Sequence, residues 1–180
     1  AGFDVKDVHM TDLIAGREDL SEVHMIVFVG GFSNSDVLGS AKGWAGSFLY
    51  NPKAKAALDT FYAREDTLSL GVCNGCQVMM ELEKIYPEQA SHPKMHHNDS
   101  GKFESAFVNV DVLPNDTVML GTLSHSKLGI WLAHGEGKFV LPQEESEYAI
   151  RLDASYDEFP RNRNGSSYAP AALASKDGHH

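Results

Sequence analysis

The sequence predicts an α/β domain with a central, mostly parallel sheet, helices on both faces of that sheet, and an antiparallel β extension. Two short apolar runs, Val23–Val29 and Thr67–Val72, have the length and composition of buried parallel strands. Between them and after the second, apolar residues recur at helical spacing over 51–64 and 75–84. Beyond Pro93 the apolar segments become short and separated by turns. This order is typical of a doubly wound sheet that carries an added β-rich segment.

The first half of the chain supplies the elements of the parallel sheet. Val23–Val29 is rich in β-branched residues and ends in Gly30-Gly31-Phe32-Ser33, a turn that brings bare backbone to the carboxyl edge of the sheet. Asn51-Pro52 predicts a helix start, with Asn as the N-cap and Pro in the first helical position. That helix is expected to run to about Arg64. The second strand and second helix follow directly.

The second half predicts an antiparallel extension built from short strands. These strands are expected over Glu104–Leu113, Gly129–Ala133, Lys138–Leu141 and Tyr148–Leu152, with a polar loop over 155–168. The sequence contains no internal repeat, low-complexity tract or flexible linker. We therefore expect residues 1–180 to form one domain.

Both ends of the sequence look cut, and we expect this domain to be truncated at each of them. Phe3 and Val5 alternate with charged residues, a weak strand pattern that begins at once. Ala171–Ser175 predicts a short strand, and Lys176-Asp177-Gly178 predicts a hairpin turn whose return strand would lie beyond His180.

Composition excludes several classes of protein. The formal net charge of −10 argues against nucleic acid or an anionic membrane surface as the main partner. No apolar run approaches the ~20 residues needed to span a bilayer. The 2 cysteines are three positions apart, unlike the disulfide framework of a secreted domain. We therefore expect a cytoplasmic protein in a reducing compartment.

Cys73 is the strongest candidate for chemistry. It stands between the predicted strand over 67–72 and the helix that follows, with Gly71 two positions before it and Gly75 two after it. Small residues at those positions allow the sharp strand-to-helix turn that exposes a nucleophile, as in the G-x-S-x-G elbow of hydrolases. The N–H groups and positive dipole end at a helix start favour the thiolate form. The pattern predicts a catalytic nucleophile.

Other interpretations of the two cysteines remain open. Cys73 and Cys76 form a C-x-x-C pair, which also occurs in redox proteins and in zinc sites. A thioredoxin-type pair usually lacks a glycine two positions before its first cysteine, and 2 cysteines exclude an all-cysteine tetrahedral site. The two could also be inert core residues. Cys76 itself is expected to be a small packing residue of the helix.

Several further segments carry a resemblance to a known family. They include Asp36-Val37-Leu38-Gly39, Gly43-Trp44-Ala45, Cys73-Asn74-Gly75-Cys76-Gln77, His97-Asn98-Asp99-Ser100-Gly101-Lys102-Phe103-Glu104, His134-Gly135-Glu136-Gly137 and Ser155-Tyr156-Asp157-Glu158. Together with the Gly30-Gly31-Phe32-Ser33 turn, they make the chain resemble the class I glutamine amidotransferase (glutaminase) domain of phosphoribosylformylglycinamidine synthases. The resemblance covers essentially the whole chain and implies a flavodoxin-like, class I glutamine amidotransferase-like fold.

The resemblance also implies a reaction. Cys73 would attack the side-chain amide of glutamine, release ammonia and form a glutamyl thioester. Backbone N–H groups of Asn74 and of the Gly31-Phe32 turn would stabilise the oxyanion, and Gln77 would bind the glutamine. Asn98 and Phe103 are weaker candidates for the same pocket. No metal or cofactor is expected in this domain, because ATP and Mg²⁺ would be used by a separate synthetase domain that amidates formylglycinamide ribonucleotide for purine biosynthesis.

The histidines of the chain call for separate interpretations. In the family, the catalytic histidine and glutamate lie in a Pro-His-Pro-Glu-like segment that this sequence does not contain, so we expect little or no glutaminase turnover from the chain alone. His134-Gly135-Glu136 has the same His-x-Glu spacing but is expected to be structural or to line the rim of the pocket. His92, His96 and His97 are expected to be solvated loop residues, because no carboxylate or cysteine stands at ligand spacing.

Two alternative functions remain open. A flavodoxin-like thiol hydrolase or deglycase would share the elbow but generally lack the glutamine four positions after the nucleophile. A non-catalytic docking domain would keep the scaffold without binding glutamine. A variant at Gln77 tests the first alternative, and protection of Cys73 by glutamine against alkylation tests the second.

Overall fold

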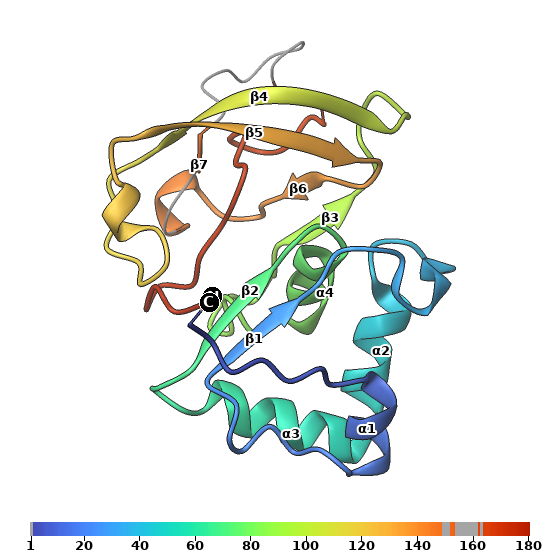
Figure 1. Ribbon diagram of the computed structural model, residues 1–180. Helices are drawn as coiled ribbons and strands as arrows, with labels where there is room; N and C mark the ends of the chain where they lie inside the picture. Colours follow the sequence, from blue (N-terminus) through green and yellow to red (C-terminus); the bar gives the residue numbers. More distant parts are fainter. Residues whose placement is uncertain (1, 149–151, 154–161, 163) are drawn as a thin grey trace.

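The computed structural model describes residues 2–148, 152–153, 162 and 164–180. The helices are α1 (Met10–Ala15), α2 (Lys42–Tyr50), α3 (Pro52–Tyr62) and α4 (Asn74–Leu82). The strands are β1 (Met25–Phe28), β2 (Leu68–Gly71), β3 (Lys94–His96), β4 (Glu104–Val112), β5 (Lys127–His134), β6 (Lys138–Val140) and β7 (Leu152–Asp153). In Figure 1, α1, α2 and α3 lie on one side of the molecule and β4 and β5 lie on the opposite side. β1, β2 and α4 lie between these two groups.

The two predicted parallel strands are present and pair with each other. β1 and β2 run parallel, with Met25 opposite Leu68 and Phe28 opposite Gly71. Helix α4 packs against both strands on one face. On the opposite face Val27 and its register partner Leu70 are 49% and 39% exposed. The predicted parallel core is therefore confirmed, with its helical cover on one face of this pair in the part of the chain that the structure describes.

Helix α3 begins where the sequence predicted. The side-chain oxygen of Asn51 accepts hydrogen bonds from the N–H groups of Lys53 and Ala54 at 3.1 and 3.0 Å, and Pro52 occupies the first turn. The predicted apolar face is buried and joins the core cluster; its members are Ala54, Ala57, Leu58 and Phe61. The ring of Phe28 in β1 makes edge-on contacts with the rings of Trp44 and Phe48 in α2.

Helices α1 and α2 were not anticipated. α1 is only 6 residues long and ends at Gly16, which adopts a left-handed conformation with φ 74°. α2 contains Gly43 and Gly46, and glycine has a low helix propensity that masks the helical pattern. Packing against α3 and α4 stabilises α2 despite these residues.

The extension is antiparallel, as predicted. β4 pairs with β5 over the register from Glu104–His134 to Asp111–Lys127, and β7 pairs with the other edge of β4. β3, which the sequence did not reveal, pairs with β6 in a separate antiparallel sheet. Of the strand expected over Tyr148–Leu152, residues 149–151 lie outside the described residues, and the structure shows β7 at Leu152–Asp153.

Two predicted strands near the ends are wrong. Phe3 and Val5 lie in irregular chain, since alternation over so few residues forms no strand without a pairing partner. Residues 171–175 form no regular strand, and only single-residue bridges occur, at Pro170 and Ala174. The turn after them is present, with the Gly178 N–H donating to the Ser175 carbonyl at 3.0 Å. Much of the polar loop expected over 155–168 lies outside the described residues, at 154–161 and 163.

Within the described residues, none of the helices has both the length and the apolar composition required to cross a bilayer.

Candidate active site

Cys73 forms the junction between β2 and α4. It is the N-cap residue of α4 and has φ 57° and ψ −114°, a backbone conformation that costs a non-glycine residue free energy. Its side chain is exposed and its thiol is free. The strained, exposed elbow predicted from the sequence is therefore present.

The glycines around Cys73 are required by close packing. A Cβ on Gly75 would lie 1.8 Å from the carbonyl oxygen of Phe28, and a Cβ on Gly71 would lie 2.7 Å from the Gly75 oxygen. A Cβ on Gly30 would lie 3.2 Å from the Cβ of Cys73, which places the end of β1 directly against the elbow. The strand-to-helix turn and the turn after β1 can approach each other only because these side chains are missing.

The predicted oxyanion donors are free to bind a ligand. Among the described residues, the backbone N–H groups of Gly31, Phe32 and Asn74 find no acceptor within the protein. Gly31 has φ 130°, a conformation accessible essentially only to glycine. The N–H of Ser33 donates to the side-chain oxygen of Asn74 at 3.2 Å, which fixes this turn to the start of α4.

Asn74 and Gln77 form a buried pair beneath the elbow. The Asn74 amide donates to the Gln77 side-chain oxygen at 2.7 Å, and the Gln77 amide donates to the backbone oxygen of Glu136 at 3.0 Å. Both side chains are buried. A carboxamide has two donor hydrogens and two acceptor lone pairs, so Gln77 keeps one of each for a ligand. Its role in binding glutamine stays a prediction.

Asn98 and Phe103 differ in whether their side chains are available to contact a ligand. The Asn98 amide donates to the carbonyls of Lys102 and His134, while its oxygen accepts from the Gly137 N–H and contacts the ring of His134. All four of its hydrogen-bonding positions are used and the residue is only 3% exposed. Asn98 therefore supports the turn over 134–137 rather than offering groups to a ligand. Phe103 is 62% exposed and packs near Gly135.

Cys76 differs sharply from Cys73. Burial raises the pKa of the Cys76 thiol to about 12, so this residue stays protonated at neutral pH. The two cysteines are both free thiols. A partly buried, protonated second cysteine that packs against the core fits the role expected for Cys76.

The His134-Gly135-Glu136 segment is not arranged as an acid–base pair. The ring of His134 contacts the side-chain oxygen of Asn98 at 3.0 Å, and burial lowers its pKa. The Glu136 carboxylate instead contacts Ser40 and lies 3.3 Å from the ring of His97. In the described part of the chain, no side chain hydrogen-bonds to the Cys73 sulfur.

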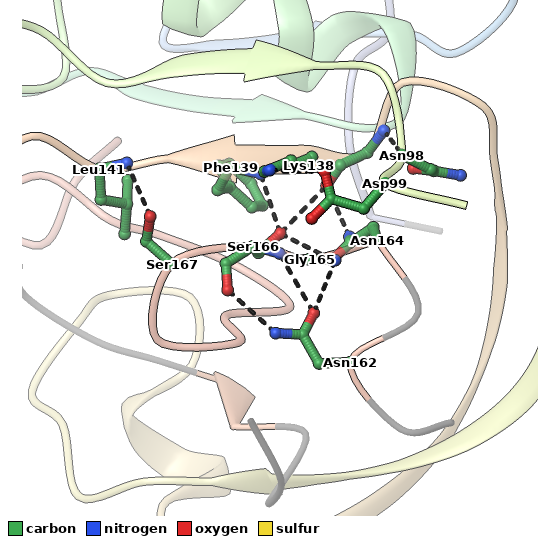
Figure 2. Close-up of polar contacts among 11 residues, drawn as sticks. Asn98, Asp99, Lys138, Phe139, Leu141, Asn162, Asn164, Gly165, Ser166 and Ser167 are labelled. Atoms are coloured by element: carbon green, nitrogen blue, oxygen red, sulfur yellow. Dashed lines mark hydrogen bonds and ion pairs between the residues drawn. The ribbon is translucent and has the colours of Figure 1, made fainter. Parts of the chain in front are cut away.

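A polar network holds the turn over 134–137 and the start of β6 (Figure 2). The amide of Asn164 donates to the Gly137 carbonyl at 2.7 Å. Next to it, the hydroxyl of Ser166 accepts from the Phe139 N–H at 2.9 Å, and Lys138 pairs with Asp99 at 2.6 Å. Asn164 and Ser166 thereby fix the start of β6 and the turn before it.

The contacts that join the loop after β1 to the extension are not indicated by the sequence, although some of the residues that make them stand in the motifs quoted above. The contacts are made by Asp36 and Ser40, together with the carboxylate of Glu136. Ser40 and Glu136 are 96 positions apart, and nothing in a single sequence indicates such a pairing. The charged residues at 36 and 136 were visible, but their partners were not.

The histidines predicted to be solvated loop residues differ: His97 is exposed, His96 is exposed but belongs to β3, and His92 is only partly exposed, with its Nδ1 buried and without a hydrogen-bond partner. His92 lies 3.5 Å from Glu83, and His97 lies near Glu136. Across the described residues, no group of three or more His, Cys, Asp or Glu side chains is gathered around one point.

Comparison with known proteins matches the CobB/CobQ-like glutamine amidotransferase domain over residues 1–180. Among curated proteins, the chain is 40% identical to the probable phosphoribosylformylglycinamidine synthase, chloroplastic/mitochondrial, of Arabidopsis thaliana and 42% identical to the phosphoribosylformylglycinamidine synthase of Dictyostelium discoideum. Each match covers 100% of this chain but 14% of the relative.

Among solved structures, PurLQS from Thermotoga maritima matches with a TM-score of 0.67 and 24% identity, covering 90% of this chain and 68% of that one. This likeness confirms the predicted fold class, a class I glutamine amidotransferase-type α/β fold.

Proposed function

Because the chain belongs to the CobB/CobQ-like glutamine amidotransferase domain family, we propose that it is the glutaminase part of a phosphoribosylformylglycinamidine synthase. The observation that carries the proposal is the exposed Cys73 in its strained conformation, beside free backbone N–H groups. Because the chain spans only 14% of the curated relatives, the ATP- and Mg²⁺-dependent amidation of formylglycinamide ribonucleotide is assigned to a synthetase part of a longer polypeptide or complex. The two free thiols fit a reducing compartment such as the cytoplasm.

The reaction begins with attack of the Cys73 sulfur on the amide carbon of glutamine. A carbon–sulfur bond forms, and the former carbonyl oxygen becomes an oxyanion. The N–H groups of Gly31, Phe32 and Asn74 are the donors that support it, because they are unpaired and Gly30, next to Gly31, packs against Cys73. The carbon–nitrogen bond then breaks, and the nitrogen takes up the thiol proton and leaves as ammonia. Water hydrolyses the glutamyl thioester and restores the thiol.

Gln77 and Phe103 complete the proposed glutamine pocket. Hydrogen bonds from Asn74 and to the Glu136 carbonyl hold the Gln77 carboxamide in one orientation. Its remaining donor hydrogen and acceptor lone pair therefore have fixed directions for a ligand. The exposed ring of Phe103 is available to cover a bound substrate. Asn98, whose hydrogen-bonding positions are filled, is assigned to supporting the wall of the pocket.

Proton transfer limits what this chain does alone. No described imidazole or carboxylate reaches the Cys73 sulfur, so the described residues supply no general base or acid to it. We therefore propose that it reacts covalently with glutamine-like electrophiles but produces glutamate slowly. Glutamate production from glutamine at about 1 s⁻¹ or faster, an ordinary enzymatic rate, would contradict this assignment.

Labelling of Cys73 tests the proposal. The 180-residue chain is treated with a diazo-ketone analogue of glutamine, and the modified residue is identified by mass spectrometry. We expect an adduct on Cys73 that free glutamine suppresses and that Cys73→Ser abolishes. The matched control Cys76→Ser should label normally, because Cys76 is partly buried and its raised pKa keeps it protonated. An adduct that glutamine does not suppress would favour a non-catalytic docking domain.

A second variant separates the glutaminase from a thiol hydrolase or deglycase. Gln77→Ala should reduce labelling by the glutamine analogue at least tenfold while leaving alkylation by iodoacetamide within about twofold. Undiminished labelling by the analogue would favour the hydrolase alternative, which does not need a glutamine at this position.

A further inference from the structure

The loop after β1 is attached to the antiparallel extension through one side chain, Glu136. The Glu136 carboxylate accepts hydrogen bonds from the Ser40 N–H at 2.5 Å and from the Ser40 hydroxyl at 3.0 Å. Its other oxygen lies 3.3 Å from the ring of His97. Gly39 packs directly against the same carboxylate, since a Cβ there would lie 3.0 Å from it.

The loop that Glu136 holds is strained. Asp36, Ser40 and Ala41 have φ values of 46°, 47° and 59°, a left-handed conformation that is unfavourable for residues with a Cβ. Such a loop persists only when its surroundings fix it at several points. Within this loop Val37 and Leu38 are exposed, so apolar packing supplies little of that restraint.

Two carboxylates supply the restraint from either end. Asp36 accepts a hydrogen bond from the Ala41 N–H at 2.9 Å and contacts the Asn74 amide at 3.4 Å, which fixes the near end of the loop to the elbow. Glu136 fixes the far end at Ser40. The unpaired N–H groups of Gly31 and Phe32 lie just before this loop, so its position sets theirs.

Glu136 itself is held in place. Its carbonyl accepts from Gln77 at 3.0 Å, and the next residue, Gly137, is bonded on both sides by Asn98 and Asn164. A side chain on so constrained a turn has a defined direction, and it points into the loop beside the nucleophile.

We propose that Glu136 is a positioning residue that holds the loop over 36–41, and with it the oxyanion donors, in place for attack by Cys73. The inference rests on the proposed glutaminase function. The Glu136 side chain contacts Ser40 and His97 and makes no contact with the Cys73 sulfur. It acts through Ser40, which predicts an effect on the rate of the covalent step and not on exposure of the thiol.

The test measures how fast the diazo-ketone glutamine analogue inactivates Cys73 in the 180-residue chain, across a range of analogue concentrations. We expect Glu136→Ala to lower the maximal inactivation rate at least tenfold, with the concentration for half-maximal rate changed by less than threefold. Glu136→Gln, which keeps one acceptor oxygen, should recover part of the rate. Ser40→Ala should have the smaller effect, because the backbone N–H of residue 40 still reaches Glu136. Glu144→Ala, at an exposed glutamate, is the matched control and should equal the wild type.

Alkylation by iodoacetamide and the melting temperature provide the readouts that separate positioning from folding. Iodoacetamide needs no oxyanion donor, so its rate should stay within twofold in every variant. Equal loss of both labelling reactions in Glu136→Ala and Glu136→Gln would overturn the inference, because it would mean general damage to the fold. An unchanged analogue rate in Glu136→Ala would also overturn it, while the proposed function would stand. Absence of glutamine-suppressible labelling in the wild type would overturn both.

Discussion

The helical half of the molecule and its antiparallel extension are held together by different interactions. Buried apolar side chains pack α1–α4 against β1 in a core cluster that also takes in Met95, Phe139, Leu141 and Tyr148 at the base of the extension. In the extension, Asn98, Asn164 and Ser166 bond to backbone groups of the turn over 134–137 and of β6 (Figure 2). Phe107 and Trp131 are exposed on the outer face of the extension. Their rings are in edge-on contact, with the ring centroids 5.2 Å apart.

The difference teaches how the candidate site is built. Apolar packing depends on shape and volume, and it brings the two turns at Gly30 and Cys73 within van der Waals distance. Hydrogen bonds depend on direction, and they fix the Glu136 side chain where it reaches Ser40. The nucleophile therefore depends on tight packing, whereas the loop that faces it depends on polar contacts. Substitutions in each half should fail in different ways.

The largest effect is expected from Gly75→Ala, which tests the packing half of the comparison. The added Cβ would meet the Phe28 carbonyl at 1.8 Å, and backbone on both sides cannot yield. We expect a loss of about 4 kcal/mol or more in the free energy of unfolding, measured by urea denaturation. The matched control is Gly46→Ala in α2, whose Cβ would sit 3.6 Å from the Tyr50 ring and should stabilise the protein by about 1 kcal/mol. Similar stability of the two variants would show that the elbow tolerates expansion.

Asn98→Ala tests the polar half and should have the next largest effect. It removes the hydrogen-bond partner of the Gly137 N–H in a buried contact, and that of the Lys102 and His134 carbonyls in partly buried contacts. We expect a loss of about 3 kcal/mol in the free energy of unfolding. Asn109→Ala, at an exposed position on β4, is the control and should change stability by less than about 0.5 kcal/mol. If Asn98→Ala matched its control, the amide network would not be what holds the extension.

The same contrast explains how much of the fold the sequence predicts. Strands β1 and β2 and helices α3 and α4 were anticipated because a local signal marks each of them: apolar runs, the Asn51-Pro52 start and the glycines around Cys73. Helix α2 was missed because Gly43 and Gly46 weaken its local signal, and packing against its neighbours overrides that weakness. Strand β3 was missed because three residues carry no usable periodicity, and only pairing with β6 defines it.

The features of the candidate site also differ in whether the local sequence indicates them. Cys73, Gly31 and Asn74 stand in short motifs, so their placement at the elbow follows from nearby sequence. The bond between Ser40 and Glu136 joins positions 96 apart, and only the folded arrangement of the extension brings them together. Local sequence therefore anticipates the nucleophile, while long-range hydrogen bonds escape it.

A smaller effect is expected from Asn51→Ala, which sharpens the comparison by removing a polar contact from the apolar half. Asn51 caps α3 at the surface, and water can replace it on the freed N–H groups of Lys53 and Ala54. We expect a loss of about 1 kcal/mol, well below that of Asn98→Ala, by the same urea measurement. Asn51→Asp keeps the acceptor and should stay within a few tenths of a kcal/mol of the wild type. A loss as large as that of Asn98→Ala would remove the distinction between surface caps and the buried network.

The pH dependence of stability offers the finest test, because His134, a half-buried imidazole in the extension, contributes to it. Burial lowers the pKa of His134 below its ordinary value of 6.5. As the pH falls below 6.5, the unfolded chain takes up a proton that the folded chain does not, so the free energy of unfolding decreases. His180, whose pKa burial also lowers, contributes in the same direction and is unchanged in a His134→Gln variant. We therefore expect the decrease between pH 7.5 and 5.5, measured by urea denaturation, to be smaller in His134→Gln than in the wild type but not abolished. An equal or larger decrease in the variant would show that His134 is not held neutral by the network around Asn98 and Gly137.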